Sequence, residues 1–317
     1  MYKIAVLTVD NQNSISQVSK NEPEINPLPY LKEYITKQFF LSKNNSFQIL
    51  ENIYRHYDIC LNLCDGAEGD DRPGIEVVQF LEKKTMPFTG AGSAFYEPSR
   101  IAMKDAALKS KVMIPAYQYI HKIEELSTLK LQFPIIVKHF NSYSSIGLTK
   151  ESVVFDFDSL QQQTRRMLKL YKKVLLESYI EGDEYTVLVA SVSKNEVKAY
   201  YPAKIIFPHG EHFKYFDLKW QNHHKMKYIP CPNKGVADLL MEKSIAIYKN
   251  MNGSGYARFD YRIDKHNNLY FLELNPNCSL FYPPNNASSA DEILSFKQND
   301  KQTFVNTILS YAVQRFQ

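Results

Sequence analysis

The chain has 317 residues, a formal net charge of +4, 44% hydrophobic residues and 23% charged residues. That length is enough for two or three domains with cores of their own, and the composition is ordinary for a globular protein. The basic residues are scattered, which argues against a nucleic-acid-binding protein, and no apolar run approaches the length of a transmembrane helix.

The first residues alternate apolar and polar side chains and lack the long apolar region of a signal peptide, so we expect a cytoplasmic protein. The four cysteines have neither CxxC spacing nor histidine-rich surroundings, which predicts reduced thiols rather than a zinc site or a disulfide framework. They are Cys60, Cys64, Cys231 and Cys278.

Residues 1–92 alternate strand and helix signals, which predicts an α/β domain with a mostly parallel sheet. The expected elements are strands at 3–9, 58–63 and 86–89 and a helix at 74–83. A second α/β unit is expected over residues 93–176, with helices at 98–111 and 158–172 and a strand at 133–138.

The remainder, residues 177–317, is richer in strands. We expect one antiparallel sheet with helices packed on it, so the whole chain would combine an α/β part and an α+β part in three domains. The strands assigned to this sheet are at 174–177, 185–192, 197–201, 256–263 and 269–274, and the helices are at 235–251 and 303–316.

Two of these strands flank a polar turn at 264–268, a pattern typical of an antiparallel hairpin. Arg258 and Asp260 share one parity on the first strand, and Glu273 and Asn275 share one on the second, so all four can converge on one patch. Hard oxygen donors of this kind suit Mg²⁺ that phosphates also hold, which indicates a nucleotide-using enzyme. Alone the spacing is weak, because acidic residues beside a hairpin are most often solvated.

A predicted strand delivers Lys138 to a turn rich in hydroxyl groups. Lys138 can act as a point charge on a phosphate, and the turn can surround phosphate oxygens with backbone amides and hydroxyls. The residues of the turn are Ser142, Ser144, Ser145 and Gly147. The alternative is a strand that ends in an ordinary serine-rich loop.

A further extended run ends at Glu177, turns at Gly182 and resumes at Glu184. Such a segment can read an adenine ring with main-chain groups, and Glu184 can accept hydrogen bonds from ribose; a plain strand–turn–strand remains the alternative. Later in the chain, Lys219 precedes the single tryptophan, Trp220, and either side chain can form a lid over a site. The alternative is that Trp220 belongs to the core and Lys219 is solvated.

The order of these motifs resembles that of the ATP-grasp superfamily, and specifically of D-alanine–D-alanine ligase. LESYIEGDEYTV is similar to the family's EExIxGxEFTV hinge, VKHFNSYSSIGL to its VKPxxxGSSVGM loop, and RFDYRID…LYFLELN to RxDxxxD…xYxLExN. CDGAEGDDRPGIEVVQFLEKKTMPFTGAG resembles its acidic-glycine loop, helix and PYTGSG segment. The resemblance covers most of the chain and implies an ATP-grasp fold that follows an N-terminal α/β (pre-ATP-grasp) domain.

The resemblance also implies roles for individual residues. Lys104 and Lys138 would hold the phosphates of ATP, and Gly147 would belong to the loop that closes over them. Glu177 would accept a hydrogen bond from the adenine amino group, and the main chain of Ser178, Tyr179 and Ile180 would complete the contacts to the ring. Glu184 would hold the ribose. Asp260, Glu273 and Asn275 would bind two Mg²⁺ ions, which Mn²⁺ can replace, while Arg258, Lys219, Ser144 and Ser145 would act in catalysis.

In this family a γ-phosphoryl group is transferred to a carboxylate, and an amine then displaces phosphate to form an amide. Phosphoryl transfer mostly needs positioning and charge neutralisation, which suits an inventory of lysines, arginine, carboxylates and metal. A closing loop would keep water from the acyl phosphate.

Several departures from the family fall in its substrate pocket. The glutamate of an N-terminal HExxVS-type motif, which holds the amine of the first D-alanine, is absent from LTVDNQNSISQVSK, and Leu63-Cys64-Asp65-Gly66 replaces a histidine–glycine pair. Trp220 replaces a tyrosine, and the segment 276–282 replaces a PGMT-type turn. The expected substrate-pocket residues are Trp220, Cys278, Ser279 and Tyr282. With Phe281 they suggest a bulkier, more apolar pocket, although these aromatic residues can equally be core.

We therefore expect an ATP-dependent ligase that joins an amino acid or small peptide-like acid to an amine, with D-alanine itself in doubt. The alternatives are an ATP-grasp phosphotransferase with a hydroxyl acceptor and a non-catalytic nucleotide-binding module. The expected partners are small-molecule substrates rather than nucleic acid or membrane, and the family suggests a homodimer.

Overall fold

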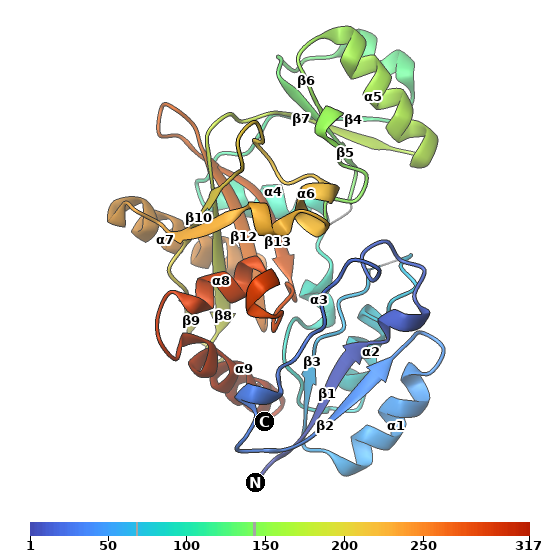
Figure 1. The fold of residues 1–317 in the computed structure, drawn as a ribbon, viewed down its shortest axis with the longest axis vertical. Helices are drawn as coiled ribbons and strands as arrows, with labels where there is room; N and C mark the ends of the chain where they lie inside the picture. The colour runs from blue at the N-terminus through green and yellow to red at the C-terminus, as the bar shows by residue number, and fades with distance from the viewer. Residues whose placement is uncertain (68, 142–143) are drawn as a thin grey trace.

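The computed structural model describes residues 1–67, 69–141 and 144–317, and it contains three β-sheets. The sheets occupy separate parts of the molecule, and the C-terminal helix lies close to the N-terminal sheet (Figure 1). Parallel and antiparallel parts are both present, which confirms the predicted α/β and α+β fold class.

The N-terminal sheet consists of three parallel strands in the order β2 (Ile35–Leu41), β1 (Lys3–Val9) and β3 (Ile59–Asn62). Side chains of a strand alternate between its faces, so β1 contributes to two hydrophobic clusters. Ala5 and Leu7 pack with α1 (Ser46–His56) and α2 (Ile75–Lys83), whereas Ile4 and Val6 pack with α9 (Asp300–Phe316). The last helix of the chain thus covers one face of the first sheet.

The expected strand at 86–89 was wrong, and two elements were not anticipated. Phe88 forms only an isolated bridge with Cys60, because Pro87 has no N–H group with which to extend a ladder. β2 was missed because it is an edge strand that mixes polar and apolar side chains, with Lys37 and Phe40 both exposed. α1 was missed as well.

The central sheet is antiparallel, so the expectation of a second α/β unit was wrong. Its order is β4 (Tyr117–Ile120), β7 (Val174–Ser178), β5 (Ile135–His139) and β6 (Val153–Val154), and α5 (Phe157–Leu170) packs on it. β7 had been expected in the C-terminal sheet. Its side chains Val174, Leu175 and Leu176 are fully buried, which fits a strand with a neighbour on each side.

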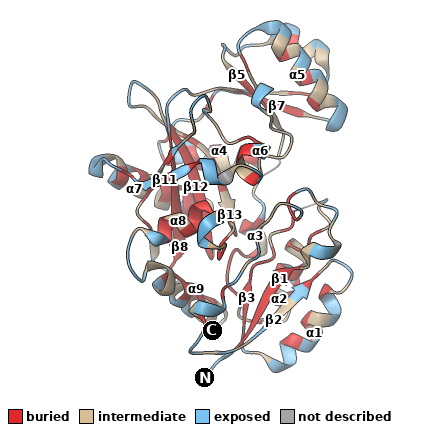
Figure 2. Cartoon of the chain, viewed as in Figure 1, coloured by how far each residue is buried: buried red, intermediate tan, exposed pale blue. Residues whose placement is uncertain are grey.

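The C-terminal sheet is antiparallel, as expected. Its main path runs β11 (Lys227–Pro230), β10 (Ala203–Ile206), β8 (Asp183–Ser191), β12 (Tyr256–Ile263) and β13 (Leu269–Pro276), and β9 (Val197–Ala199) also pairs with β8. The predicted hairpin is confirmed: Asp260 lies opposite Glu273 and Arg258 opposite Asn275, with a register shift after Asp260. β8 and β12 are buried, whereas α1 and α5 expose their outer sides (Figure 2).

Helices cover this sheet and bring further side chains toward it. α4 (Arg100–Lys109) contacts β13 and α7 (Lys234–Asn250), and α8 (Ser289–Ser295) contacts β8. Ser99 begins α4 by accepting a hydrogen bond from the Ala102 amide, which places Lys104 on the buried side of the helix. The remaining short helices are α3 (Ser93–Tyr96), α6 (Phe216–Trp220) and 3₁₀ turns at Asn11–Asn13, Leu28–Tyr30, Ile123–Thr128, Lys150–Ser152, His223–Lys225 and Pro284–Asn286.

Among the described residues no helix is both long and apolar enough to cross a membrane. All four cysteines are buried free thiols, as predicted. We propose to divide the chain into domains at 1–92, 93–176 and 177–317; β7, which ends at Ser178, crosses the second of these boundaries.

Candidate active site

Two cavities adjoin where the three parts of the chain meet. The first is lined by residues of the central and C-terminal sheets, and the second by residues of the loops after β3 and β13. Five residues line both cavities: Arg100, Lys219, Arg258, Glu273 and Ser279. A ligand that spans the junction would therefore contact basic and acidic groups together.

Glu177 holds two lysines from different elements; Glu177 and Lys138 line the first cavity, whereas Lys104 is buried behind them and lines neither cavity. Lys104 of α4 lies 2.5 Å and Lys138 of β5 lies 2.6 Å from its carboxylate oxygens. Burial alone would raise the pKa of Glu177, but the ammonium groups of Lys138 and Lys104 lower it to about 2. The structure thus brings together the two lysines expected at ATP phosphates, and both Glu177 oxygens face them rather than open space.

The segment after Glu177 lines the first cavity with Ser178, Tyr179 and Ile180. The amides of Ser178 and Tyr179 donate to the carbonyls of Ala116 and Pro134, which holds the segment extended. Both amides are thus already paired within the protein, and the adenine-binding role of this segment stays a prediction.

Glu184 also lines the first cavity, and it contacts two cations that the sequence analysis missed. Arg262 lies 2.9 Å and Lys214 lies 3.0 Å from its carboxylate. Arg262 also donates to the Ile180 carbonyl at 2.7 Å. Its parity with Arg258 on β12 was a signal that could have identified Arg262, whereas Lys214 lies in a loop and has no comparable local signal.

The hairpin residues converge as their parity predicted. Arg258 donates to both carboxylate oxygens of Asp260, at 3.1 and 2.9 Å. The Asn275 amide lies 3.4 Å from both Asp260 and Glu273, and Arg100 lies 3.1 Å from Glu273. Burial alone would raise the pKa of both carboxyls, but the neighbouring cations lower it. The largest such effect comes from Arg258 at Asp260 and from Arg100 at Glu273.

This donor set fits a hard cation in part. Asp260, Glu273 and Asn275 offer two ionised carboxylates and one amide oxygen, the ligand types that Mg²⁺ takes. Across residues 1–67, 69–141 and 144–317, no group of three or more His, Cys, Asp or Glu side chains is placed to hold a metal ion. A metal at this hairpin would therefore need further oxygen ligands, such as phosphates.

The expected phosphate loop is held against the segment that carries Lys219. Ser144 and Ser145 both have φ of 57°, and Gly147 has φ of 77°, a left-handed conformation that favours glycine. The Trp220 indole donates to the Ser144 carbonyl at 3.1 Å, and the Ser145 hydroxyl donates to the Lys214 carbonyl at 2.9 Å. Ser142 lies outside the described residues.

Trp220 is buried and Lys219 is half-buried, so neither side chain is fully solvated. Burial, and then the positive charges of Arg258 and Lys214, lower the pKa of Lys219 to about 7. Trp220 lines the first cavity. Trp220 therefore lines the site, and its indole also holds the loop at Ser144 through a hydrogen bond.

The expected substrate residues separate between the two cavities. Cys278 lines the second cavity, Tyr282 the first, and Ser279 both. Phe281 packs against Tyr30 in a hydrophobic cluster and lines neither of the two cavities. Phe281 therefore belongs to the core.

Comparison with known proteins agrees with this geometry. Residues 110–280, more than half of the chain, match the family model described as D-ala D-ala ligase C-terminus. The chain is 26% identical to a D-alanine–D-alanine ligase of Acinetobacter baylyi, over 69% of each chain. It is 29% identical to the protein y4sG of Sinorhizobium fredii, over 68% of this chain and 63% of that relative. It is 32% identical to a D-alanine–D-alanine ligase B of Clostridium tetani, over 52% of this chain and 45% of that relative.

Solved structures share the fold over the full length. A D-alanine–D-alanine ligase from Bacillus anthracis complexed with ATP superposes with a TM-score of 0.69 at 18% identity, covering 100% of this chain and 99% of that one. The VanG D-Ala:D-Ser ligase from Enterococcus faecalis gives a TM-score of 0.68 at 16% identity, with the same coverage. The fold and the site together define an ATP-grasp protein. Within that class, the chain belongs to the D-alanine–D-alanine ligase family.

Proposed function

We propose that the protein is an ATP-dependent ligase that joins a carboxylate to an amine through an acyl phosphate. The observation that carries the proposal is the junction of the two cavities, which both have Arg100, Lys219, Arg258 and Glu273 in their lining. Relatives named D-alanine–D-alanine ligase support the same reaction class.

The reaction has two steps, phosphoryl transfer and then amide formation. A carboxylate oxygen attacks the γ-phosphorus, the bond between that phosphorus and the bridging oxygen breaks, and ADP leaves. The amine nitrogen then attacks the acyl carbon, the carbon–oxygen bond to phosphate breaks, and the nitrogen loses a proton. Each step moves negative charge, which fixed cations stabilise most effectively in a site from which water is excluded.

The chain's own residues supply those cations. Lys104 and Lys138, held by Glu177, would bind the nucleotide phosphates, and Arg258 and Lys219 would face the transferred group. Asp260, Glu273 and Asn275 would hold Mg²⁺, which neutralises phosphate charge when bound. Arg258 pairs with Asp260 and Arg100 with Glu273, so both arginines would have to turn toward the substrates when a metal ion binds these carboxylates.

We also propose a site for two Mg²⁺ ions, a homodimer and a cytoplasmic location, as the family resemblance implies. The carboxylate substrate would be an amino acid or a small peptide-like acid. The missing N-terminal glutamate and the Asp65 loop support a substrate pocket that differs from the family's own.

The test is phosphate release from Mg-ATP across D- and L-amino acids and small dipeptides, with mass spectrometry on every active mixture. A condensed product with ADP would support the ligase and identify its substrates. A stable phosphorylated hydroxyl compound would instead indicate a phosphotransferase. If no mixture of the panel releases more phosphate with the wild-type protein than with Glu273→Gln, a non-catalytic nucleotide-binding protein would be favoured.

A further inference from the structure

The segment from the end of β10 to the end of α6, residues 207–220, carries several of the residues that line the first cavity. They are Phe213, Lys214, Lys219 and Trp220. Residues 178–180, at the end of β7, line the same cavity. A nucleotide in this cavity would therefore contact both segments, and we call residues 207–220 the lid segment.

Arg262 joins the lid segment to the C-terminal sheet. It lies opposite Glu184 in the register of β12 and β8, and its side chain is 3% exposed. Its Nε and Nη2 lie 3.2 and 2.9 Å from the same Glu184 oxygen. Nη1 also donates to the Ile180 carbonyl at 2.7 Å, and Nη2 donates to the His212 carbonyl at 2.5 Å. One guanidinium group thus connects β8, the residues after β7 and the lid segment, which requires the planar fork of an arginine.

The His212 carbonyl accepts a second hydrogen bond, from the Tyr179 hydroxyl at 3.0 Å. The centroid of the Tyr179 ring lies 4.7 Å from the guanidinium carbon of Arg262 and 6.1 Å from the centroid of the Phe213 ring. Tyr179 and Arg262 both line the first cavity. Two side chains of the cavity wall thus hold the lid segment at one backbone oxygen.

The bonds at His212 bear on the position of a charge that faces the first cavity. Lys214 follows His212 by two residues, and its Nζ lies 3.0 Å from the other Glu184 oxygen and 3.8 Å from Asp260. Lys214 lies in a loop, so its position depends on how the lid segment is held. The held segment presents this ammonium group where we propose that the nucleotide binds.

The contacts of Arg262 differ in what a movement of the lid segment would do to them. β8 and β12 are buried neighbours within one sheet, so Arg262 and Glu184 stay paired when the lid segment moves. The bond to the His212 carbonyl joins the sheet to a loop and has to break if the segment opens. Arg262 stands at a position that the RxDxxxD motif leaves open, so the family resemblance gave it no role.

We propose that Arg262 is a positioning residue that holds the lid segment closed over a bound nucleotide and releases the His212 carbonyl when the nucleotide leaves. The closed segment keeps Lys214 and Lys219 at the phosphates, so Arg262 acts on the reaction through these lysines. The inference rests on the proposed ligase function and adds the residue that controls how long the nucleotide stays bound.

The test measures the rate at which bound ADP leaves after dilution, followed by the fluorescence of Trp220. Arg262→Lys keeps a charge beside Glu184 but loses the planar fork, and we expect it to speed release by about 10-fold, as for loss of a hydrogen bond to a charged group. Tyr179→Phe keeps the ring and removes only the hydroxyl, so it should speed release by about 3-fold. In both variants the KM for ATP should change more than kcat.

Trypsin provides a second readout that needs no activity. Cleavage after Lys214 and Lys219, identified by mass spectrometry, should be about 10-fold faster in Arg262→Lys than in the wild type, with or without ADP. The control is Lys204→Gln, because Lys204 on β10 pairs with Asp183 at 2.6 Å and lines neither cavity. Its ADP release and its cleavage should match those of the wild type.

Unchanged ADP release or unchanged cleavage in Arg262→Lys would overturn the proposal, and so would equal effects in Lys204→Gln. A wild-type protein that binds no ADP would contradict the proposed function, and cleavage of the ligand-free variants would then decide whether Arg262 holds the segment. If thermal denaturation shows that Arg262→Lys is unfolded, Tyr179→Phe decides by the same two readouts, because it preserves the pair of Arg262 and Glu184.

Discussion

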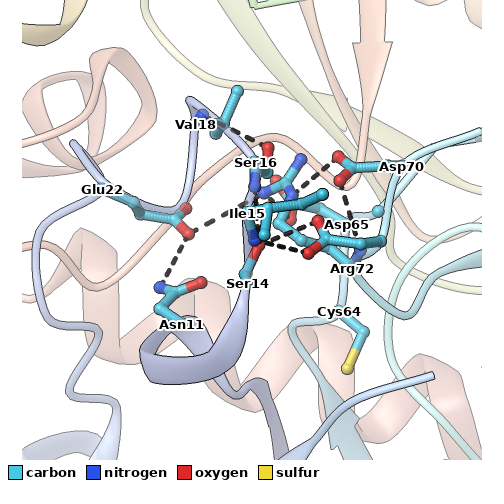
Figure 3. Close-up of polar contacts among 12 residues, drawn as sticks. Asn11, Ser14, Ile15, Ser16, Val18, Glu22, Cys64, Asp65, Asp70 and Arg72 are labelled. Atoms are coloured by element: carbon cyan, nitrogen blue, oxygen red, sulfur yellow. Dashed lines mark hydrogen bonds and ion pairs between the residues drawn. The ribbon is translucent and has the colours of Figure 1, made fainter. Parts of the chain in front are cut away.

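Tyr282 donates a hydrogen bond of 2.6 Å to Glu22 and so joins residues 260 positions apart in the chain. The contact connects the loop after β1 with the turn after β13. It lies between the N-terminal sheet and the candidate substrate site. Glu22 and Asp65 both pair with the buried Arg72 (Figure 3). Burial of Glu22 and then the negative charge of Asp65 raise the pKa of this carboxyl against the effect of the Tyr282 hydrogen bond, so the stability of the protein depends on pH.

The first prediction concerns that dependence. The folded-state pKa of Glu22 is raised from 4.5 to about 7, so the folded protein binds a proton that the unfolded chain releases. This contribution to stability is complete below about pH 4.5 and is lost as the pH rises through about 7, by about 3 kcal/mol. Urea denaturation between pH 4.5 and 8 should show a flatter profile for Glu22→Gln, whereas Glu24→Gln, on an exposed side chain, should follow the wild type.

Glu177→Ala should destabilise the protein by about 3 kcal/mol, because it leaves the buried Lys104 and the half-buried Lys138 without their counter-charge. ATP should restore part of the stability, since phosphates replace the carboxylate, and the KM for ATP should rise more than kcat falls. Denaturation with and without ATP measures the first effect and steady-state kinetics the second. Glu51→Ala removes an exposed partner of Lys84 and should cost less than about 1 kcal/mol. A fall in kcat without a change in KM would remove Glu177 from the nucleotide site.

Glu273→Gln should reduce turnover by roughly 100-fold or more, because it removes a negative charge from the proposed metal site and a partner from Arg100. The Mg²⁺ concentration for half-maximal nucleotide binding should rise at the same time. Glu242→Gln, an exposed side chain of α7 paired with Lys243, is the control. A normal rate in Glu273→Gln would contradict the metal assignment.

Lys219 should make nucleotide affinity depend on pH. Its pKa of about 7 means that the ammonium form, which attracts phosphate, predominates below that pH and is lost above it. The Kd for ADP should therefore rise between pH 6 and 8, and Lys219→Arg should flatten the rise because a guanidinium stays charged. The fluorescence of Trp220, the single tryptophan, is the readout, and Lys225→Arg is an exposed control. A Kd independent of pH in the wild type would contradict this prediction.

Trp220→Phe should loosen the loop at Ser144 by removing the indole N–H donor. Water would then reach the acyl phosphate more often, so the ratio of phosphate released to amide formed should rise above one. Trp220→Tyr keeps a polar hydrogen, and we expect it to alter acid or amine preference more than ATP affinity. An unchanged ratio and unchanged selectivity in both variants would make Trp220 a purely structural residue.

The sequence alone determined the hairpin and the identity of its polar residues. Alternation along β12 and β13 is a local property, so Arg258, Asp260, Glu273 and Asn275 were placed on one patch from parity, and the structure pairs them. The motif order also indicated the family, because it depends only on residue types and their spacing along the chain.

Only the tertiary structure decided that β7 belongs to the central sheet, which residues pair with Glu177, and which loops meet at Arg72. A strand with buried side chains carries no record of its partners, so β7 was assigned to the wrong sheet. Ion pairs such as Lys214–Glu184 and Arg72–Glu22 join loops that are distant in the chain. Their formation depends on the packing of whole sheets and helices, which brings the loops together and excludes water from the charges.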